Sequence, residues 1–103
     1  MSWIKLDSEH DESDKYEYYG NIYYFKKNTR IPHNPYGPSY IDLAGYKVYY
    51  IEGKIHRLDG PARIFPSGRG DHWINGKFIK EEEFELHPER LKFLDKEYLL
   101  CPI

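Results

Sequence analysis

The side chains in this sequence that could carry acid–base chemistry are a histidine and an aspartate close together. His56 and Asp59 have a spacing at which a carboxylate can orient an imidazole that acts as a general base. No activated nucleophile accompanies them, because Ser39 and Ser67 lie in predicted turns and Cys101 lies close to the end of the sequence. We therefore expect no enzymatic activity.

Metal ions and phosphate groups have no predicted site either. No recognisable zinc spacing links the candidate ligands, which are His33, His56, His72 and Asp59. The single cysteine excludes a cysteine-based zinc site and an internal disulfide, which fits a reducing cytosol. The stretch 68–70 (Gly-Arg-Gly) contains one arginine and does not lead into a helix, as a phosphate-binding loop would. We expect no metal and no other cofactor.

Two of the histidines belong to an internal repeat. When residues 33–56 are aligned with residues 56–79, an offset of 23, eight of 24 positions are identical. A catalytic group rarely needs duplication at equal spacing, so we expect the identical residues to shape the repeat instead. The identical pairs are His33/His56, Gly37/Gly60, Pro38/Pro61, Ile41/Ile64, Gly45/Gly68, Ile51/Ile74, Gly53/Gly76 and Lys54/Lys77.

A weaker third copy of the repeat lies upstream. Residues 22–25 resemble residues 48–51 at an offset of 26, and Gly20 takes the place of the turn residue Gly45. Because the offset falls to 23 at His33, the intervening turn should hold about three extra residues. The chain therefore contains two and a half to three copies of the repeat.

Each copy predicts short antiparallel strands joined by tight turns. The pairs Glu52/Gly53 and Asn75/Gly76 separate two apolar stretches, and a type I′ turn requires two residues with left-handed backbone. Gly60, between an aspartate and a proline, reverses the chain into the next copy. We predict an antiparallel meander of repeated β-hairpins with a period of 23 residues.

Strand alternation predicts an aromatic ladder on this sheet. If the copies stack in register, Tyr24, Tyr50 and Trp73 line one face. The opposite face would be lined by Phe25, Ile51 and Ile74. Both faces are then substantially apolar, so each requires a cover.

The C-terminal part of the chain has a helical composition. We predict a short helix near 81–86 and a longer one near 88–99, docked on one sheet face, while Trp3 and its neighbours cover part of the other. The fold class is therefore β-rich α+β, in a single domain over residues 1–103. Its parts are an acidic N-terminal segment at 1–15, hairpin repeats at 16–79 and C-terminal helices at 80–103.

The most specific motif begins at His56. It reads His-Arg-x-Asp-Gly-Pro-Ala over residues 56–62, followed by Trp-x-Asn-Gly-Lys over residues 73–77. This pattern resembles a hairpin repeat of small tailed-bacteriophage proteins and of longer giant-virus arrays, which is in style a distant relative of the membrane-occupation-and-recognition-nexus (MORN) repeat. The resemblance covers residues 33–79 well and 16–32 weakly. The copy at 33–53 departs from it, because Asn-Pro-Tyr-Gly replaces Arg-x-Asp-Gly and Glu52 replaces Asn. The resemblance implies a scaffold and a viral context, and no catalytic site.

The net charge of −2 hides an uneven distribution. Residues 1–20 carry −4, residues 21–80 carry +6 and residues 81–103 carry −4. Acidic termini that offset a basic sheet are the simplest interpretation, while a basic binding face and acidic flanks that imitate a polyanion stay open. No apolar run is long enough to span a membrane, and the N-terminus is acidic where a signal peptide is apolar. We expect a cytoplasmic protein, in the bacterial host if it is phage-encoded.

Two functions from different classes stay open. In the first, the chain is a small phage-type interaction protein that binds a host protein stoichiometrically and inhibits or redirects it, with components of anti-phage defence among the candidates. Aromatic anchors with arginine at the rim are typical of binding hot spots. The candidate residues are Tyr24, Tyr50, Trp73, Arg57 and Arg69.

The second function is a nucleic-acid-binding module on the basic central sheet. Ten of the eleven tyrosines lie between residues 16 and 50, interleaved with lysine and arginine, and such a surface can stack bases and bind phosphates. The acidic termini count against a polyanion ligand. An exposed terminal strand could also pair with a second copy of the chain, so a homodimer stays open.

Overall fold

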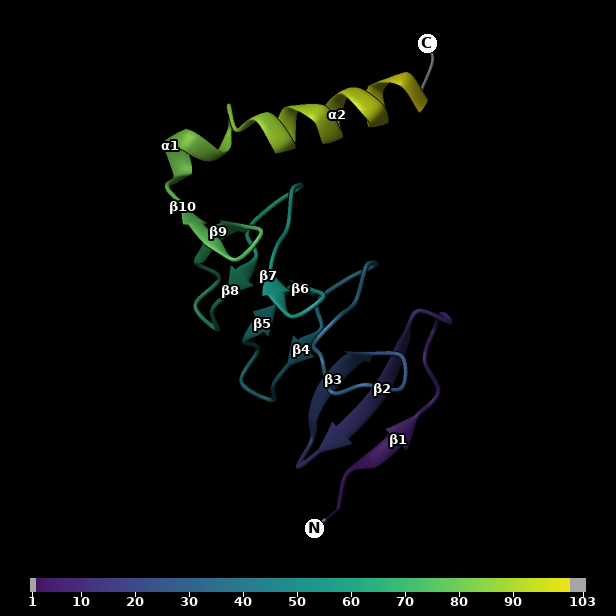
Figure 1. The fold of residues 1–103 in the computed structure, drawn as a ribbon. Helices are drawn as coiled ribbons and strands as arrows, with labels where there is room; N and C mark the ends of the chain where they lie inside the picture. Colours follow the sequence, from purple (N-terminus) through teal and green to yellow (C-terminus); the bar gives the residue numbers. More distant parts are fainter. Residues whose placement is uncertain (1, 101–103) are drawn as a thin grey trace.

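The structure, a computed structural model, describes the backbone of residues 2–100 and the side chains of residues 2–95, so Cys101 lies outside the described residues. Ten short strands precede two helices (Figure 1). The strands are β1 (Ile4–Leu6), β2 (Ser13–Tyr18), β3 (Asn21–Lys26), β4 (Tyr40–Ile41), β5 (Lys47–Val48), β6 (Tyr50–Ile51), β7 (Lys54–Ile55), β8 (Arg63–Ile64), β9 (Gly70–Ile74) and β10 (Lys77–Ile79). The helices are α1 (Glu81–Phe84) and α2 (Pro88–Leu100).

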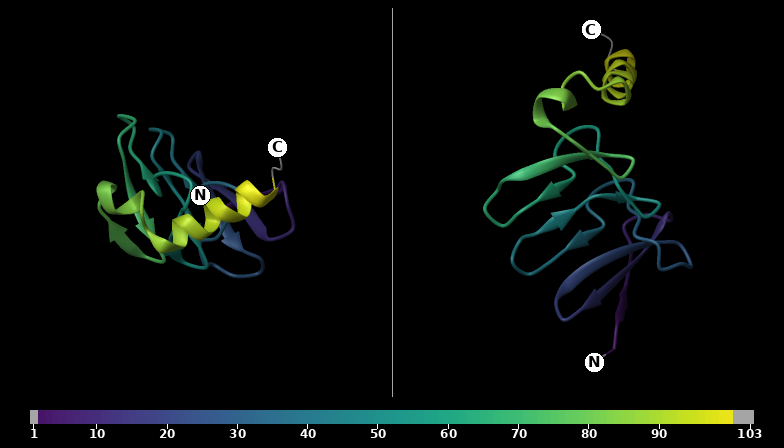
Figure 2. Two further views of the ribbon diagram at one scale, coloured as in Figure 1. Left: turned by 90° about the horizontal axis from the view of Figure 1, so that it is seen from above. Right: turned by 60° about the vertical axis from the view of Figure 1, so that its left-hand side comes forward.

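The strands form an antiparallel sheet that follows the chain. Eight of them pair in the order β1-β2-β3-β4-β5-β8-β9-β10, and β6 and β7 form a separate two-stranded sheet. Successive hairpins therefore lie one above another from the N-terminal to the C-terminal end, as Figure 2 shows. The predicted β-rich α+β class is confirmed. Strands begin at Ile4, earlier than the predicted boundary at residue 16, because β1 and the start of β2 lie in the acidic segment.

The predicted type I′ turns are present. The backbone φ angles are 47° and 83° at Glu52 and Gly53, and 52° and 80° at Asn75 and Gly76. These turns connect β6 to β7 and β9 to β10. Positive φ at consecutive residues gives a turn whose twist matches that of the flanking strands, which explains why these dipeptides lie here.

Backbone hydrogen bonds correct the predicted register of the first hairpin. The N–H of His33 donates to the carbonyl of Tyr24 at 3.0 Å, and the N–H of His56 donates to that of Tyr49 at 3.0 Å. Tyr24 therefore corresponds to Tyr49, an offset of 25, and the predicted correspondence with Tyr50 is wrong. The turn after β3 accordingly holds two extra residues rather than three.

This register overturns the predicted aromatic ladder. Phe25, Tyr50 and Trp73 hold corresponding positions, since each pairs with the residue at the equivalent position in the returning half of its hairpin. Tyr24 precedes Phe25 in β3, so its side chain points to the opposite face. The sheet face of Tyr50 and Trp73 is therefore also the face of Phe25.

The core is small and distributed along the stack. The buried apolar side chains come from several successive units and number only one or two in each, as in repeat proteins whose units contact mainly their neighbours. They are Tyr24, Phe25, Val48, Ala62, Ile74 and Phe84.

The helices lie at the C-terminal end of the stack. Phe84 of α1 is buried and its ring lies 3.9 Å from that of His72, centroid to centroid. Pro88 begins α2, as predicted. Figures 1 and 2 show α2 crossing the end of the stack beyond β10, so the expectation that it docks along a sheet face is wrong. Among the described residues, no helix is long and apolar enough to cross a membrane.

Candidate interaction surface

One face of the sheet carries a row of aromatic side chains, which we term the aromatic face. Cross-strand pairing places Tyr16, Tyr23 and Tyr40 side by side on it, because paired residues of antiparallel strands point to the same side. The aromatic face comprises Trp3, Tyr16, Tyr18, Tyr23, Phe25, Tyr40, Tyr46, Tyr50, Phe65, Trp73 and Phe78.

Ring contacts connect the row across the strands. The centroid distances are 4.6 Å from Trp3 to Tyr23, 5.1 Å from Tyr23 to Tyr40, and 6.0 Å from Tyr40 to Tyr46. Tyr46 continues the row to Phe65 at 5.6 Å. Most of these rings meet at steep angles, the edge-to-face geometry that aromatic quadrupoles favour. The rings therefore hold one another in place.

Arg63 lies between the rings of Phe65 and Trp73 and so connects the row to its C-terminal end. The guanidinium of Arg63 lies 5.4 Å from the ring centroid of Phe65 and 5.1 Å from that of Trp73. It donates to both carboxylate oxygens of Asp71, at 3.0 and 2.7 Å, and this bond keeps the pKa of Asp71 below its usual value. The indole N–H of Trp73 donates to the same carboxylate at 2.7 Å, and its ring lies 5.7 Å from that of Phe78.

A second arginine lies at the N-terminal end of the row. The guanidinium of Arg30 is 5.3 Å from the ring centroid of Trp3, 5.0 Å from that of Tyr16 and 5.5 Å from that of Phe25. Cation–π contacts of this kind hold a guanidinium against a ring while its in-plane donors stay available. The aromatic face thus has one arginine at each end.

The aromatic face is half-exposed. Phe78 is 57 % exposed and Trp3 is 38 % exposed, whereas Phe25 is buried beneath its neighbours. Neither helix covers the row in the described part of the chain: Phe84 packs on His72, whose side chain points to the other face, and Phe93 lies in a groove on the turn side. A row of partly exposed rings of this kind is typical of an interaction site.

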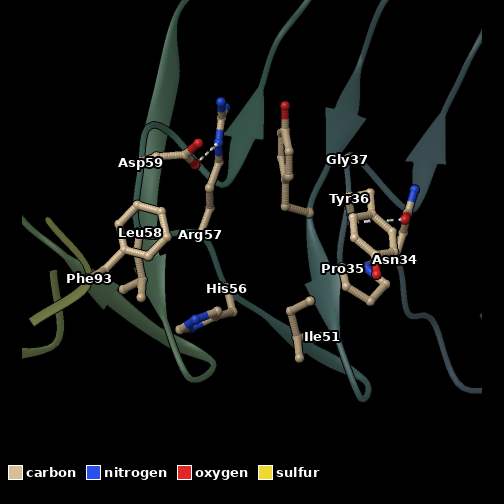
Figure 3. Close-up of a pocket in the computed structure, with 11 residues that line it drawn as sticks. Asn34, Pro35, Tyr36, Gly37, Ile51, His56, Arg57, Leu58, Asp59 and Phe93 are labelled. Atoms are coloured by element: carbon tan, nitrogen blue, oxygen red, sulfur yellow. Dashed lines mark hydrogen bonds and ion pairs between the residues drawn. The ribbon is translucent and has the colours of Figure 1, made fainter. Parts of the chain in front are cut away.

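The turn side of the stack carries a groove of about 460 Å³ (Figure 3). It lies between the turn 34–37 and the turn 57–59, with Phe93 of α2 at one wall. Asn34 Nδ2 donates to the carbonyl of Pro38 at 3.0 Å, and Arg57 Nη1 donates to that of Pro61 at 3.1 Å. The two turns differ in sequence, but in each of them the side chain of the first residue donates to the carbonyl of the residue four positions later. Arg57 therefore stabilises its own turn.

The repeated histidines also have one shared contact. His33 Nδ1 accepts a hydrogen bond from the backbone N–H of Glu52 at 2.9 Å, and His56 Nδ1 accepts one from Asn75 at 3.0 Å. Each ring thus binds the first turn residue of the following hairpin. Burial lowers the pKa of His56. Since Nδ1 already accepts a hydrogen bond, the arrangement explains the repetition of histidine without any acid–base role.

The structure separates the five candidate binding residues. Tyr50 and Trp73 lie on the aromatic face. Tyr24 is buried on the opposite face, where its hydroxyl donates to the carboxylate oxygens of Glu9 at 2.9 Å. Arg57 lies in the groove wall and Arg69 lies exposed in the turn before β9.

Most residues of the aromatic face were not among the candidates. Trp3, Tyr23, Tyr40, Tyr46 and Phe65 come from five different segments, and the recurrence of aromatic residues in or beside predicted strands was the signal available in the sequence. The row could not be identified from that pattern without the strand register, because a shift of one residue moves a side chain to the other face.

No protein-family model, curated protein or solved structure matches the chain. Among the described residues, no three histidine, cysteine, aspartate or glutamate side chains are grouped so that they could hold a metal ion. The aromatic face and its two arginines are therefore the features on which a function can be argued.

Proposed function

We propose that this chain is a small interaction protein that binds another protein through the aromatic face and acts by stoichiometric binding, without turnover. The observation that carries the proposal is the partly exposed row from Trp3 to Phe78, which the described side chains of the two helices do not cover. Rings that are already held by their neighbours lose little side-chain entropy on binding, so burying them contributes more affinity than burying mobile side chains would.

The partner class rests on the resemblance of the hairpins to phage and giant-virus repeats. We propose that residues 16–79 form a short MORN-like array with a 23-residue period. The recurring contacts of His33 and His56 support that interpretation. In a phage, such a protein would act in the bacterial cytoplasm on a host protein, and an anti-phage defence component is the partner that we favour.

Nucleic-acid binding is the second candidate, because the aromatic face has tyrosines and an arginine at each end. Base stacking requires free ring faces, whereas Trp3 is stacked on Tyr18 at 4.7 Å and Tyr23 and Tyr40 meet edge to face. Of the carboxylates nearby, Asp71 is bound to Arg63 but the acidic termini would still repel a polyanion. The protein partner is therefore the better supported of the two.

Capture from bacterial lysate tests the proposal. The wild-type chain is immobilised and compared with Phe78→Ser, which removes an exposed ring of the aromatic face, and with Tyr36→Ser, which removes an even more exposed ring in the groove. We expect a protein partner that survives nuclease and raised salt, is lost with Phe78→Ser and is kept with Tyr36→Ser.

The opposite results would contradict the proposal. Capture that disappears after nuclease treatment, or that falls steeply with salt, would support nucleic acid as the ligand. Capture lost with Tyr36→Ser and kept with Phe78→Ser would move the binding surface to the groove. Thermal unfolding of both variants checks that each remains folded.

A further inference from the structure

Arg30 has an unused hydrogen-bonding capacity. Its guanidinium lies against the rings of Trp3, Tyr16 and Phe25, yet within the described residues it donates no hydrogen bond and pairs with no carboxylate. Arg30 is also exposed. A guanidinium stacked on rings keeps its planar fork of N–H donors directed outward, in the geometry that matches a carboxylate.

The other ring-stacked arginines of this chain differ in that respect. Arg57 lies over Tyr49 and binds Asp59 at 2.8 Å, and Arg63 binds Asp71 at 2.7 Å. Arg90 lies over Phe84, with a carboxylate oxygen of Glu85 at 3.6 Å. Each of them therefore has a carboxylate from the chain itself. Arg30 makes the same kind of ring contact but has no such carboxylate among the residues described.

Arg30 borders an open hollow of about 350 Å³ at the N-terminal end of the aromatic face. The hollow contains one carboxylate, that of Asp14, which is already engaged. Asp14 accepts a hydrogen bond from the backbone N–H of Asn28 at 2.8 Å and lies 3.8 Å from Lys5 Nζ. With Lys5 and Arg30 positive and Asp14 negative, the hollow has a formal charge of +1 and can accept one further negative group.

We propose that this hollow binds the carboxylate of an aspartate or glutamate on the partner protein, next to an apolar partner residue that packs on the aromatic face. The inference rests on the proposed function and names the chemistry of that partner. Rigidly held arginine beside large rings is a common composition of binding hot spots. The fork of Arg30 would bind both oxygens of the carboxylate, while the rings of Trp3 and Tyr16 would hold the guanidinium in place.

A single carboxylate fits this hollow better than a nucleic-acid backbone does. A chain of phosphates that crossed the hollow would bring several negative charges to a site whose formal charge is +1, and Asp14 would repel them. An otherwise neutral peptide with one carboxylate would add a single negative charge, which matches the charge that Lys5 and Arg30 leave once Asp14 is counted.

Selection from a displayed library of random peptides tests the inference without a known partner. The wild-type chain is compared with Arg30→Gln, which removes the charge and the fork, and with Arg69→Gln, a matched change of an exposed arginine in a turn. We expect wild type and Arg69→Gln to enrich peptides that combine an acidic residue with an aromatic or aliphatic one. With Arg30→Gln the acidic preference should disappear and the apolar one should remain.

Binding of one selected peptide then gives the magnitude. We expect Arg30→Gln to raise the Kd for that peptide about tenfold, as the loss of a charge-assisted hydrogen-bond pair does. Replacing the peptide's acid by its amide should weaken wild-type binding equally and leave Arg30→Gln unaffected. Near-ultraviolet circular dichroism of the variant checks that Trp3 remains packed.

The outcomes separate the inference from the proposed function. Enriched peptides without an acidic preference would overturn the carboxylate site and leave the aromatic face as the docking surface. No enrichment by the wild-type chain would count against both. An oligothymidylate that binds more tightly than the selected peptide, and loses affinity in Arg30→Gln, would overturn the inference in favour of phosphate.

Discussion

The imidazole of His56 accepts a hydrogen bond from the backbone N–H of Asn75, with 3.0 Å between Nδ1 and the nitrogen. Asn75 is the first residue of the turn between β9 and β10, so the histidine at the end of one hairpin holds the turn of the next. His33 holds Glu52 in the same way. An imidazole nitrogen accepts only when it is unprotonated, so both contacts depend on neutral histidine.

Lowering the pH should therefore destabilise the stack. Burial lowers the pKa of His56 from its ordinary value of 6.5, so the folded state disfavours the imidazolium. A group whose folded-state pKa is lowered contributes stability that is complete above its unfolded pKa and is lost as the pH falls through the folded one. Urea unfolding should accordingly show a midpoint that falls between about pH 7 and about pH 5.

The variant His56→Asn provides the control, because its amide oxygen can accept the Asn75 N–H but does not titrate. It should retain most of the stability at neutral pH and lose part of the pH dependence in this range. His56→Ala leaves the Asn75 N–H without its partner and should cost about 1 kcal/mol at neutral pH. Wild-type and His56→Asn chains with identical pH profiles would contradict the role of this histidine.

Replacing each of two glycines by alanine should separate the cost of backbone strain from the cost of steric crowding. Gly76 has a φ of 80°, and the nearest atom to an added Cβ would be 3.6 Å away, so the cost of Gly76→Ala comes from the left-handed backbone alone. We expect a loss of about 1–2 kcal/mol in the free energy of unfolding. Gly37 lacks a left-handed φ and an added Cβ would meet its nearest atom at 3.7 Å. Gly37→Ala should therefore be close to neutral, and equal losses in the two variants would refute the turn assignment.

Tyr24 should behave as a core residue. The residue is 7 % exposed, so Tyr24→Ala should lower the free energy of unfolding by about 3 kcal/mol or more through the cavity it leaves. Tyr24→Phe removes only the hydroxyl that binds Glu9 and should cost about 1 kcal/mol. Partner binding by Tyr24→Phe should match the wild type. A folded Tyr24→Phe chain that no longer binds would place Tyr24 in the interaction surface after all.

The ion pair on the aromatic face should contribute more than the one in the groove. Asp71 binds Arg63 through two hydrogen bonds and also accepts from Trp73, with its side chain 21 % exposed. Asp71→Asn should cost about 1–2 kcal/mol and change the near-ultraviolet circular dichroism of Trp73. Asp59 pairs with Arg57 but its side chain is 57 % exposed. Asp59→Asn should cost less than about 0.5 kcal/mol, and the reverse order would contradict the assignment.

The contribution of Asp71 is also lost on acidification, but at lower pH than that of His56. The hydrogen bond from Arg63 lowers the folded-state pKa of Asp71 below 3.8. Its contribution is therefore present above about pH 4 and is lost as the pH falls through the folded-state value. The difference in unfolding midpoint between wild type and Asp71→Asn should shrink in acid, and a constant difference would exclude an ionised Asp71.

The sequence alone predicts the β-rich class, the turns at Glu52 and Asn75 and the first residue of α2. These features depend on local chemistry, since a type I′ turn needs left-handed residues and proline favours the first turn of a helix. The position of α2 was predicted wrongly, because the docking of a helix depends on which surfaces the completed stack leaves available. The contacts of His33 and His56 likewise join residues 19 positions apart, and only the paired strands bring these together.

The sequence by itself determined that aromatic residues occur at strand spacing, and tertiary structure decided which of them share a face. Tyr24 and Phe25 are adjacent in β3, so the number of extra residues in the following turn decides which one aligns with Tyr50 and Trp73. Strand side chains alternate with a period of two, and one residue of register exchanges the buried face for the exposed one. Pairing between distant strands sets that register, which is why the aromatic face and the hollow beside Arg30 became visible only in the folded chain.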